Sequence, residues 1–155
     1  MPERPALLFV CLGNICRSPL AEAAMRLAAE GEGLDLHLDS AATASYHIGK
    51  PIDERSQIVA RKHGIDLSHR RARQVNVEDF RRFTHIFALD KGNLAALRQL
   101  VPAGATARVE LLLDNVPGRA GESVADPYFS DQDAFDITWA DVAAAAAALV
   151  ERFSR

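Results

Sequence analysis

The chain has 155 residues, of which 48% are hydrophobic and 25% are charged, and its formal net charge is −3. These values predict one soluble globular domain over residues 1–155, with no apolar run long enough to span a bilayer and no basic field to recruit nucleic acid or an anionic membrane. Its two cysteines, Cys11 and Cys16, are too few for a secreted disulfide scaffold, which favours a reducing, cytoplasmic compartment.

Strand and helix patterns alternate along the chain. We predict strands at residues 6–10, 34–40, 84–89 and 108–112. We predict helices at residues 19–28, 53–63, 93–100 and from 131 or 132 to 153. In the last helix, the spacing of Trp139, Val142, Leu149 and Phe153 indicates a core-facing side. This alternation with short connections predicts an α/β fold in three layers, a parallel sheet with helices on both faces.

The segment Cys11-Leu12-Gly13-Asn14-Ile15-Cys16-Arg17-Ser18 lies between the first predicted strand and the first predicted helix. A loop in this place aims backbone N–H groups and the positive end of a helix dipole at one point, which predicts a site for a phosphate-sized anion. Cys11 is a candidate nucleophile, because the same field stabilises a thiolate. Arg17 adds a planar, two-pronged donor to the bound anion.

The other residue types in this loop suit the same chemistry. Gly13 allows a positive φ or a close approach to the anion, and Asn14 tolerates the left-handed conformation. Ser18 is placed to hydrogen-bond the sulfur of Cys11 and to ease its departure in a second step. An isolated cysteine at a strand end is more often a buried structural residue, but this combination of neighbours favours a chemical role.

The nine residues from Cys11 to Pro19 resemble the active-site loop of the low-molecular-weight protein tyrosine phosphatases. Segments that match the family elsewhere are 40–43, 46–49, Pro51, 72–74, 79–80, 88–90 and 126–128. The resemblance implies a four-stranded parallel sheet in the order 2-1-3-4. It also implies hydrolysis of phosphotyrosine, and of aryl phosphate monoesters generally, through a phosphocysteine intermediate. No cofactor is implied, and the five His residues lack metal-ligand spacing, so no metal is expected.

Asp126 is the candidate general acid. A phenolate is a strongly basic leaving group, with a conjugate-acid pKa of about 10, so a carboxylic acid near the loop is needed to protonate it. Asp126 precedes Pro127 in a turn-rich stretch over residues 117–129, where aspartate is common for structural reasons, and its role is implied mainly by the resemblance. In the second step the same carboxylate would activate water against the phosphocysteine.

The resemblance also suggests the walls of the pocket. Tyr46 and Tyr128 match rim positions and are expected to stack on a substrate ring, whereas Phe129 is either a further rim residue or a core residue. Ile15 adds an apolar contact where related phosphoarginine phosphatases carry threonine, which favours phosphotyrosine. The predicted binding residues besides Arg17 are Leu12, Gly13, Asn14, Ile15, Cys16, Ser18, Tyr46 and Tyr128.

Further residues are expected to support the loop. Ser40, like Asn14, matches family residues that hold the loop in its strained shape. Asp90 matches an acidic residue near the loop, and a turn at the strand end is its simpler interpretation.

The family usually has His just before the Arg-Ala-Arg-Gln segment, where this chain has Arg70, with His69 one residue earlier. Either His69 shifts into the contact or Arg70 replaces it. The cluster of Arg70, Arg71 and Arg73 otherwise indicates a solvated surface patch.

Three functions compete: a tyrosine phosphatase, an arsenate reductase or phosphoarginine phosphatase on the same fold, and a noncatalytic phosphate-binding module. Arsenate reduction needs further cysteines to pass a disulfide outward, and the chain has none beyond Cys16. Mere binding needs neither Cys11 nor Asp126. Expected partners are a phosphotyrosine-bearing protein, with a tyrosine kinase among the candidate substrates, or a small aryl phosphate. Inorganic phosphate is expected as product and inhibitor, and nucleic acid and membrane are not expected as partners.

Cys16 has two interpretations, one as a space-filling residue and one as a redox partner. A reactive thiolate at Cys11 is exposed to oxidation by peroxide, and a neighbouring thiol can stop that oxidation at a disulfide. We predict that peroxide inactivates the protein reversibly through a Cys11–Cys16 disulfide.

Overall fold

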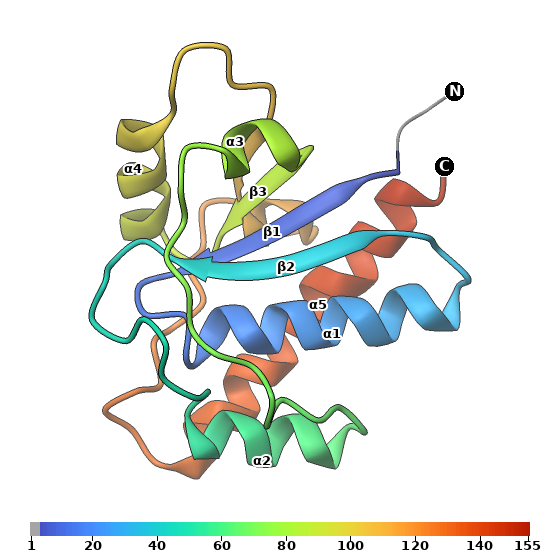
Figure 1. Ribbon diagram of the computed structural model, residues 1–155. Coiled ribbons are helices and arrows are strands. Elements are labelled where there is room, and N and C mark those ends of the chain that lie inside the picture. The colour runs from blue at the N-terminus through green and yellow to red at the C-terminus, as the bar shows by residue number, and fades with distance from the viewer. Residues whose placement is uncertain (1–3) are drawn as a thin grey trace.

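The computed structural model describes residues 4–155 (Figure 1). Four strands form a parallel sheet in the order β2-β1-β3-β4, with bounds β1 Ala6–Cys11, β2 His37–Ala42, β3 His85–Ala88 and β4 Arg108–Leu111. The helices are α1 Arg17–Gly31, α2 Glu54–Lys62, α3 Asp79–Arg82, α4 Lys91–Leu100, α5 Gln132–Phe153 and the 3₁₀ helix η1 Leu112–Asn115. The predicted α/β class and the strand order 2-1-3-4 are confirmed.

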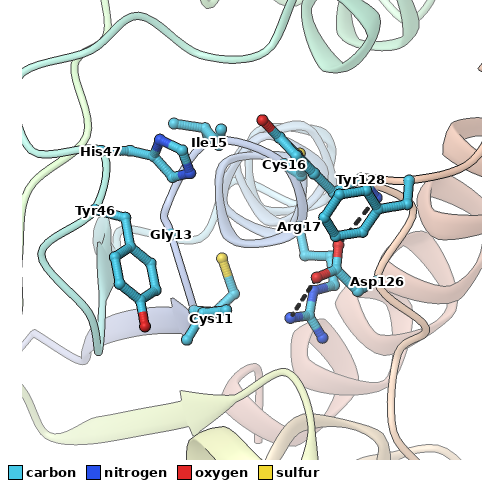
Figure 2. A pocket seen from close by; sticks show the side chains of 11 residues that line it. Cys11, Gly13, Ile15, Cys16, Arg17, Tyr46, His47, Asp126 and Tyr128 are labelled. Atoms are coloured by element: carbon cyan, nitrogen blue, oxygen red, sulfur yellow. Dashed lines mark hydrogen bonds and ion pairs between the residues drawn. The ribbon is translucent and has the colours of Figure 1, made fainter.

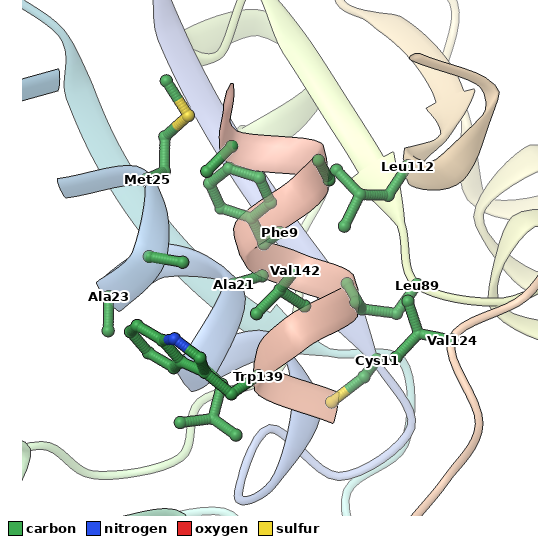
Figure 3. Close-up of a cluster of buried hydrophobic side chains, with 14 of the residues drawn as sticks. Phe9, Cys11, Ala21, Ala23, Met25, Leu89, Leu112, Val124, Trp139 and Val142 are labelled. Carbon is green, nitrogen blue, oxygen red and sulfur yellow. The ribbon is translucent and has the colours of Figure 1, made fainter. Parts of the chain in front are cut away.

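The central strand β1 is buried along its whole length, because helices cover both faces of the sheet. Leu7, Phe9 and Cys11 join a core formed with α1, α2 and α5, which Figure 3 shows with Cys11 at its edge. Leu8 and Val10 join a second core with α3 and α4. Successive side chains of a strand point to opposite faces, so a strand covered on both sides is apolar throughout rather than alternating.

The long helix α5 packs against α1 on one face of the sheet (Figures 1 and 3). The expected core-facing side is confirmed, because Trp139, Val142 and Leu149 are buried and the half-buried Phe153 packs against the same core. Alanine at buried positions such as Ala145 lets the two helices approach closely and costs little in helix propensity. Within residues 4–155, no helix is long and apolar enough to cross a membrane.

Several predicted boundaries are wrong by a few residues. The strand expected at 34–40 begins only at His37 and continues to Ala42. The reason lies in the preceding helix, since α1 extends to Gly31 and Leu34 N–H still donates to Ala29 O at 2.9 Å. Leu34 therefore packs on the core from a turn rather than from a strand.

Two short elements, η1 and α3, are not predicted by the sequence pattern. The fourth strand ends at Leu111 and continues as η1, and α3 is a single turn too short to show helical periodicity. The helix expected from residue 93 begins at Lys91, because the Asp90 carboxylate caps it by accepting from Asn93 N–H at 2.6 Å.

The carboxyl ends of the parallel strands meet at one edge of the sheet, on the left in Figure 1. The chain leaves β1 and β3 at this edge toward opposite faces, into α1 and α4 respectively. Such a switch point is where ligands bind in open parallel sheets. The loop after β1, the segment after β2 and the segment before α5 all line the pocket found there.

Candidate active site

Cys11 is the last residue of β1 and is 2% exposed, so the sheet itself fixes the position of its sulfur. In the β1–β2 register it lies opposite Ala42. The Sγ atom lies 3.1 Å from Ser18 Oγ and accepts from Asn14 N–H at 3.3 Å. The predicted contact between Ser18 and the sulfur is confirmed. The sulfur thus has two polar partners, one of which is a backbone N–H that donates to it.

Asn14 holds the loop in its turn. Its φ is 58°, and among residues 4–155 it is the only non-glycine residue with positive φ. Its amide Nδ2 donates to Ser18 Oγ at 2.8 Å and to Ser40 Oγ at 3.0 Å, while Oδ1 accepts from Arg73 N–H at 3.0 Å. A left-handed residue of this kind costs about 1–3 kcal/mol and persists when its surroundings over-determine it. Asn14 and Ser40 thus lie where a support role requires them.

Gly13 is required for a reason that the sequence does not show. Its φ is not positive, so the first predicted reason is wrong. A Cβ atom at this position would lie only 2.8 Å from Cδ2 of His47, so any side chain would collide with that ring. The close approach is therefore to His47, which lines the pocket. The resemblance covers His47 only as part of the segment 46–49 and assigns it no role of its own.

Arg17 opens α1, and its side chain is only 4% exposed. Nη1 donates to Asp90 Oδ2 at 2.7 Å and to Val124 O at 3.0 Å, whereas Nη2 faces Asp126 with an N–O distance of 3.7 Å. Burial opposes the charge on Arg17, but the negative charges of Cys11 and Asp90 outweigh burial and raise its pKa. The site therefore contains a permanent cation that is fixed on one side and available on the other.

Asp90 fulfils both interpretations that the sequence left open. One carboxylate oxygen caps the first turn of α4 and the other holds Arg17. A buried guanidinium without such a partner would be strongly destabilising. Asp90 therefore fixes the orientation of Arg17 and leaves its Nη2 side facing the pocket.

Asp126 enters the same pocket from the segment that precedes α5. Its side chain is 43% exposed, and Oδ1 accepts from Tyr128 N–H at 3.0 Å. In Figure 2 the carboxyl group points toward Arg17, across the pocket from Tyr46. Although Cys11 and Asp126 are far apart in sequence, the fold brings them to one cavity of about 210 Å³.

Aromatic side chains form much of the pocket wall. Tyr46 and Tyr128 lie on opposite sides of the Cys11 sulfur (Figure 2). Phe129 is 95% exposed, so its interpretation as a core residue is wrong, and its ring packs edge-on against Tyr128 with centroids 4.9 Å apart. The predicted binding residues that also line this cavity are Leu12, Gly13, Ile15 and Cys16. An aromatic cleft above an anion site suits a phosphorylated phenol.

Arg70, and not His69, makes the contacts that support the phosphate loop. Its Nη2 donates to Glu22 Oε1 at 2.7 Å and to Asp39 Oδ1 at 2.8 Å, whereas His69 is exposed. Glu22 belongs to α1, and Asp39 precedes Ser40 on β2. Arg70 thereby joins the two elements whose serines hold Asn14.

The interpretation of the arginine cluster as a solvated patch is therefore wrong for two of its members. Arg73 pairs with Asp39 at 3.1 Å and with the fully buried Asp79 at 3.0 Å, and only Arg71 is exposed. Burial opposes ionisation of Asp39, but hydrogen bonds from Ser40 N–H and the charges of both paired arginines lower its pKa.

Cys16 is 5% exposed and lies at the end of the loop, where it lines the pocket and contacts the core. Burial, and then the charge of Asp53, raise the pKa of its thiol. Cys11 and Cys16 are both free cysteines. In the part of the chain that the structure describes, no group of three or more His, Cys, Asp or Glu side chains is placed to hold a metal ion.

A model of the family described as low molecular weight phosphotyrosine protein phosphatase matches residues 6–155. The chain belongs to this family. It is 39% identical over 138 residues to the phosphatase of that name from Schizosaccharomyces pombe, which covers 87% of this chain and 88% of the relative. Membership identifies it as an enzyme, a protein tyrosine phosphatase that hydrolyses phosphoric monoesters.

Solved structures agree with this assignment. The crystal structure of YfkJ from Bacillus subtilis superposes with a TM-score of 0.90 at 35% identity, covering 99% of this chain and 96% of that one. A relative named drosophila arginine phosphatase has a TM-score of 0.90 at 28% identity, covering 96% of this chain and 98% of its own. The same fold therefore occurs in a protein named an arginine phosphatase.

Proposed function

We propose that this phosphatase acts on phosphotyrosine, and on aryl phosphate monoesters generally, through a covalent phosphocysteine at Cys11. The observation that carries the proposal is the convergence of three groups on one aromatic-walled pocket: the Cys11 sulfur, the Arg17 guanidinium and the Asp126 carboxyl. A nucleophile, an anion-stabilising donor and an acid are the parts that transfer of a phosphoryl group from a phenol requires.

In the proposed first step, the Cys11 thiolate attacks phosphorus as the phosphorus–oxygen bond to the phenol breaks. The electron pair leaves with the phenol oxygen, and Asp126 donates a proton to that oxygen. The Nη2 side of Arg17 and the loop N–H groups stabilise the transferring oxygens.

In the proposed second step, Asp126 takes a proton from water, and the water oxygen attacks phosphorus. The sulfur–phosphorus bond breaks and its electron pair returns to Cys11 as a thiolate, which the Ser18 hydroxyl stabilises from 3.1 Å. Inorganic phosphate is released. Since its charged oxygens resemble those of the phosphate group of the substrate, inorganic phosphate is expected to compete for the loop as an inhibitor.

The substrate ring is expected to lie between Tyr46 and Tyr128, with Ile15 as an apolar contact. We therefore expect the purified protein to hydrolyse aryl phosphate far faster than phosphoarginine and to lack arsenate reductase activity. The test is the kcat/KM for each substrate, with an Ile15→Thr variant as the matched comparison. A wild-type preference for phosphoarginine would overturn the assignment, and turnover of arsenate would favour the reductase.

We also propose a redox response within the loop. Peroxide oxidises the Cys11 thiolate to a sulfenic acid. The Cys16 sulfur then attacks the sulfenic sulfur, the sulfur–oxygen bond breaks, and the oxygen leaves as water with the proton of the Cys16 thiol, which leaves a disulfide. The support is that both cysteines are free, line one cavity and lie five positions apart. The raised pKa of Cys16 makes it less reactive toward peroxide, and its sulfur must lose its proton as it attacks, because the thiolate is the nucleophile. The Cys16→Ser variant should remain active before oxidation but fail to recover with a thiol reductant afterwards. Equal recovery of both proteins, with no disulfide by mass spectrometry, would leave Cys16 a packing residue.

We propose that residues 1–155 act as one phosphatase domain in the cytoplasm. The family match over residues 6–155 supports the first point, and two free thiols beside each other support a reducing compartment. Its substrate would then be a phosphotyrosine-bearing protein, such as a tyrosine kinase, or a small aryl phosphate. A substrate-trapping variant, such as Asp126→Ala, captures such a protein from solution if it binds with the same pocket.

A further inference from the structure

The first turn of α2 is attached directly to the phosphate loop. Asp53, which caps this helix, donates its N–H to Ile15 O at 2.9 Å. The fully buried Ser56 donates its hydroxyl to Cys16 O at 3.2 Å. Both contacts reach backbone carbonyls within the loop, so the start of α2 keeps a fixed position relative to the nucleophile.

From this fixed turn, Arg55 extends to the segment that carries the acid. Nη1 donates to Ser130 O at 2.7 Å, and Nη2 donates to Tyr128 O at 2.9 Å. The guanidinium is itself held by Asp53, whose carboxylate accepts from Nε at 3.0 Å and from Nη2 at 2.9 Å. Its Cζ atom lies 4.4 Å from the ring centroid of Phe135. A planar fork held on three sides in this way keeps one orientation.

The peptide units of Tyr128 connect this contact to the acid. Tyr128 O accepts from Arg55, and Tyr128 N–H donates to the Asp126 carboxylate at 3.0 Å. The side chains of Asp126 and Phe129 are exposed, whereas Pro127 is buried and the half-buried Tyr128 packs against the core. The position of this segment over the loop therefore depends on the Arg55 hydrogen bonds as well as on the packing of Pro127 and Tyr128.

We propose that Arg55 is a positioning residue, which sets the distance between the acid Asp126 and the nucleophile Cys11 by joining the acid segment to the phosphate loop. This inference rests on the proposed function, since it concerns the acid step of that reaction. Arg55 does not line the catalytic pocket and acts only through Asp126. Its loss should therefore resemble a partial loss of the acid and should leave the nucleophile and the anion site intact.

The test measures kcat/KM for aryl phosphates whose leaving phenols range from weakly to strongly acidic. In Arg55→Met we expect a loss of about 10- to 100-fold for phenyl phosphate, as misplacement of a catalytic group produces, and little loss for strongly acidic phenols. Inorganic phosphate should bind as in the wild type. Lys62→Met is the matched control, because it removes another α2 contact to α5, the Lys62–Asp136 pair at 2.6 Å, away from the acid.

A double-mutant comparison decides between positioning and general support. If Arg55 acts through Asp126, adding Arg55→Met to Asp126→Ala should cost almost nothing further. A loss that is equal for all phenols and multiplies with Asp126→Ala would overturn the inference. If Arg55→Met unfolds at the assay temperature, two milder variants replace it. Arg55→Lys keeps a cation at this position, and Asp53→Asn keeps a side chain that can cap α2. If these variants do not show the same dependence on the leaving phenol, the inference is overturned. Absence of leaving-group dependence in Asp126→Ala itself would instead contradict the proposed acid.

Discussion

The phosphate loop and the acid segment meet in one pocket but are held in opposite ways. In the loop, the polar side chains of Asn14, Arg17 and Ser18 are buried and bond to one another or to neighbouring strands and loops. In the acid segment, Asp126 is 43% exposed and is held through backbone groups. A site that stabilises charge must be rigid before the substrate arrives, whereas the acid must let substrate enter and product leave. Changes in the two regions should therefore have different signatures.

The largest effect is expected for Cys11→Ser, because it removes the nucleophile itself. A serine hydroxyl is a much weaker nucleophile at neutral pH than a thiolate, so turnover should fall to background for every aryl phosphate. Phosphate and vanadate should still bind, since Arg17 and the loop remain. Turnover by stopped assay and binding by calorimetry check both points, with Cys16→Ser as the matched control. Substantial hydrolysis by Cys11→Ser would contradict the covalent mechanism.

A change in the acid segment should affect substrates unequally. Asp126→Ala is expected to slow phenyl phosphate hydrolysis by about 10²- to 10⁴-fold, the usual contribution of a general acid. The deficit should shrink as the leaving phenol becomes more acidic, because such phenolates need less protonation. Asp133→Ala, at an exposed site nearby, is the control. An equal deficit across all phenols would mean that another group protonates the leaving oxygen.

Asn14→Ala should affect stability and activity together. The substitution leaves alanine with positive φ and removes three hydrogen bonds at a buried site. We expect a loss of about 1–3 kcal/mol in the free energy of unfolding, together with reduced phosphate affinity and a loss of activity that does not depend on the leaving group. Chemical denaturation and phosphate titration measure these, with Asn115→Ala as a control in η1. Wild-type affinity in Asn14→Ala would show that the loop keeps its shape without this residue.

The smallest effect is expected for Asp39, which affects how the stability of the protein depends on pH. The pKa of Asp39 is lowered in the folded protein, so its contribution to stability is present above the ordinary carboxyl pKa, about 3.9, and is lost as pH falls through the folded-state value. Asp39→Asn should therefore lower stability at neutral pH and flatten the acid side of the stability curve. Denaturation midpoints between about pH 2 and pH 6 test this, with the exposed Asp35→Asn as the control. An unchanged acid limb would contradict the role of Asp39.

The sequence is most informative where one segment carries the whole signal. Ala6–Cys11 is a continuous apolar run that ends in the candidate nucleophile, and the proposed anion loop follows it, so strand, loop and helix are all predicted from one segment. The resemblance adds the strand order and Asp126. The roles of Arg55 and His47 could not be predicted from the sequence, because their contacts join segments far apart in the chain. The role of Gly13 could not be predicted for the same reason, since the ring that it must avoid belongs to His47.

Arg70 shows a second limit of sequence reasoning. Three nearby arginines resemble a surface patch in composition, and only the fold reveals that Glu22 and Asp39 lie on either side of Arg70. Arginine in place of the histidine that the family usually has also changes how the charge of this side chain depends on pH. A guanidinium stays charged across the physiological pH range, whereas an imidazole does not.

Asp90 joins two events that are usually treated separately, the folding of a helix and the assembly of a binding site. The same carboxylate begins α4 on one face of the sheet and orients Arg17, which opens α1 on the other. Any opening of the first turn of α4 therefore releases Arg17, the cation that we propose binds the phosphoryl group. By thermodynamic linkage, an anion bound at Arg17 must in turn favour the closed state of that turn. Amide hydrogens near Asn93 thus become reporters of occupancy in a pocket that they do not line.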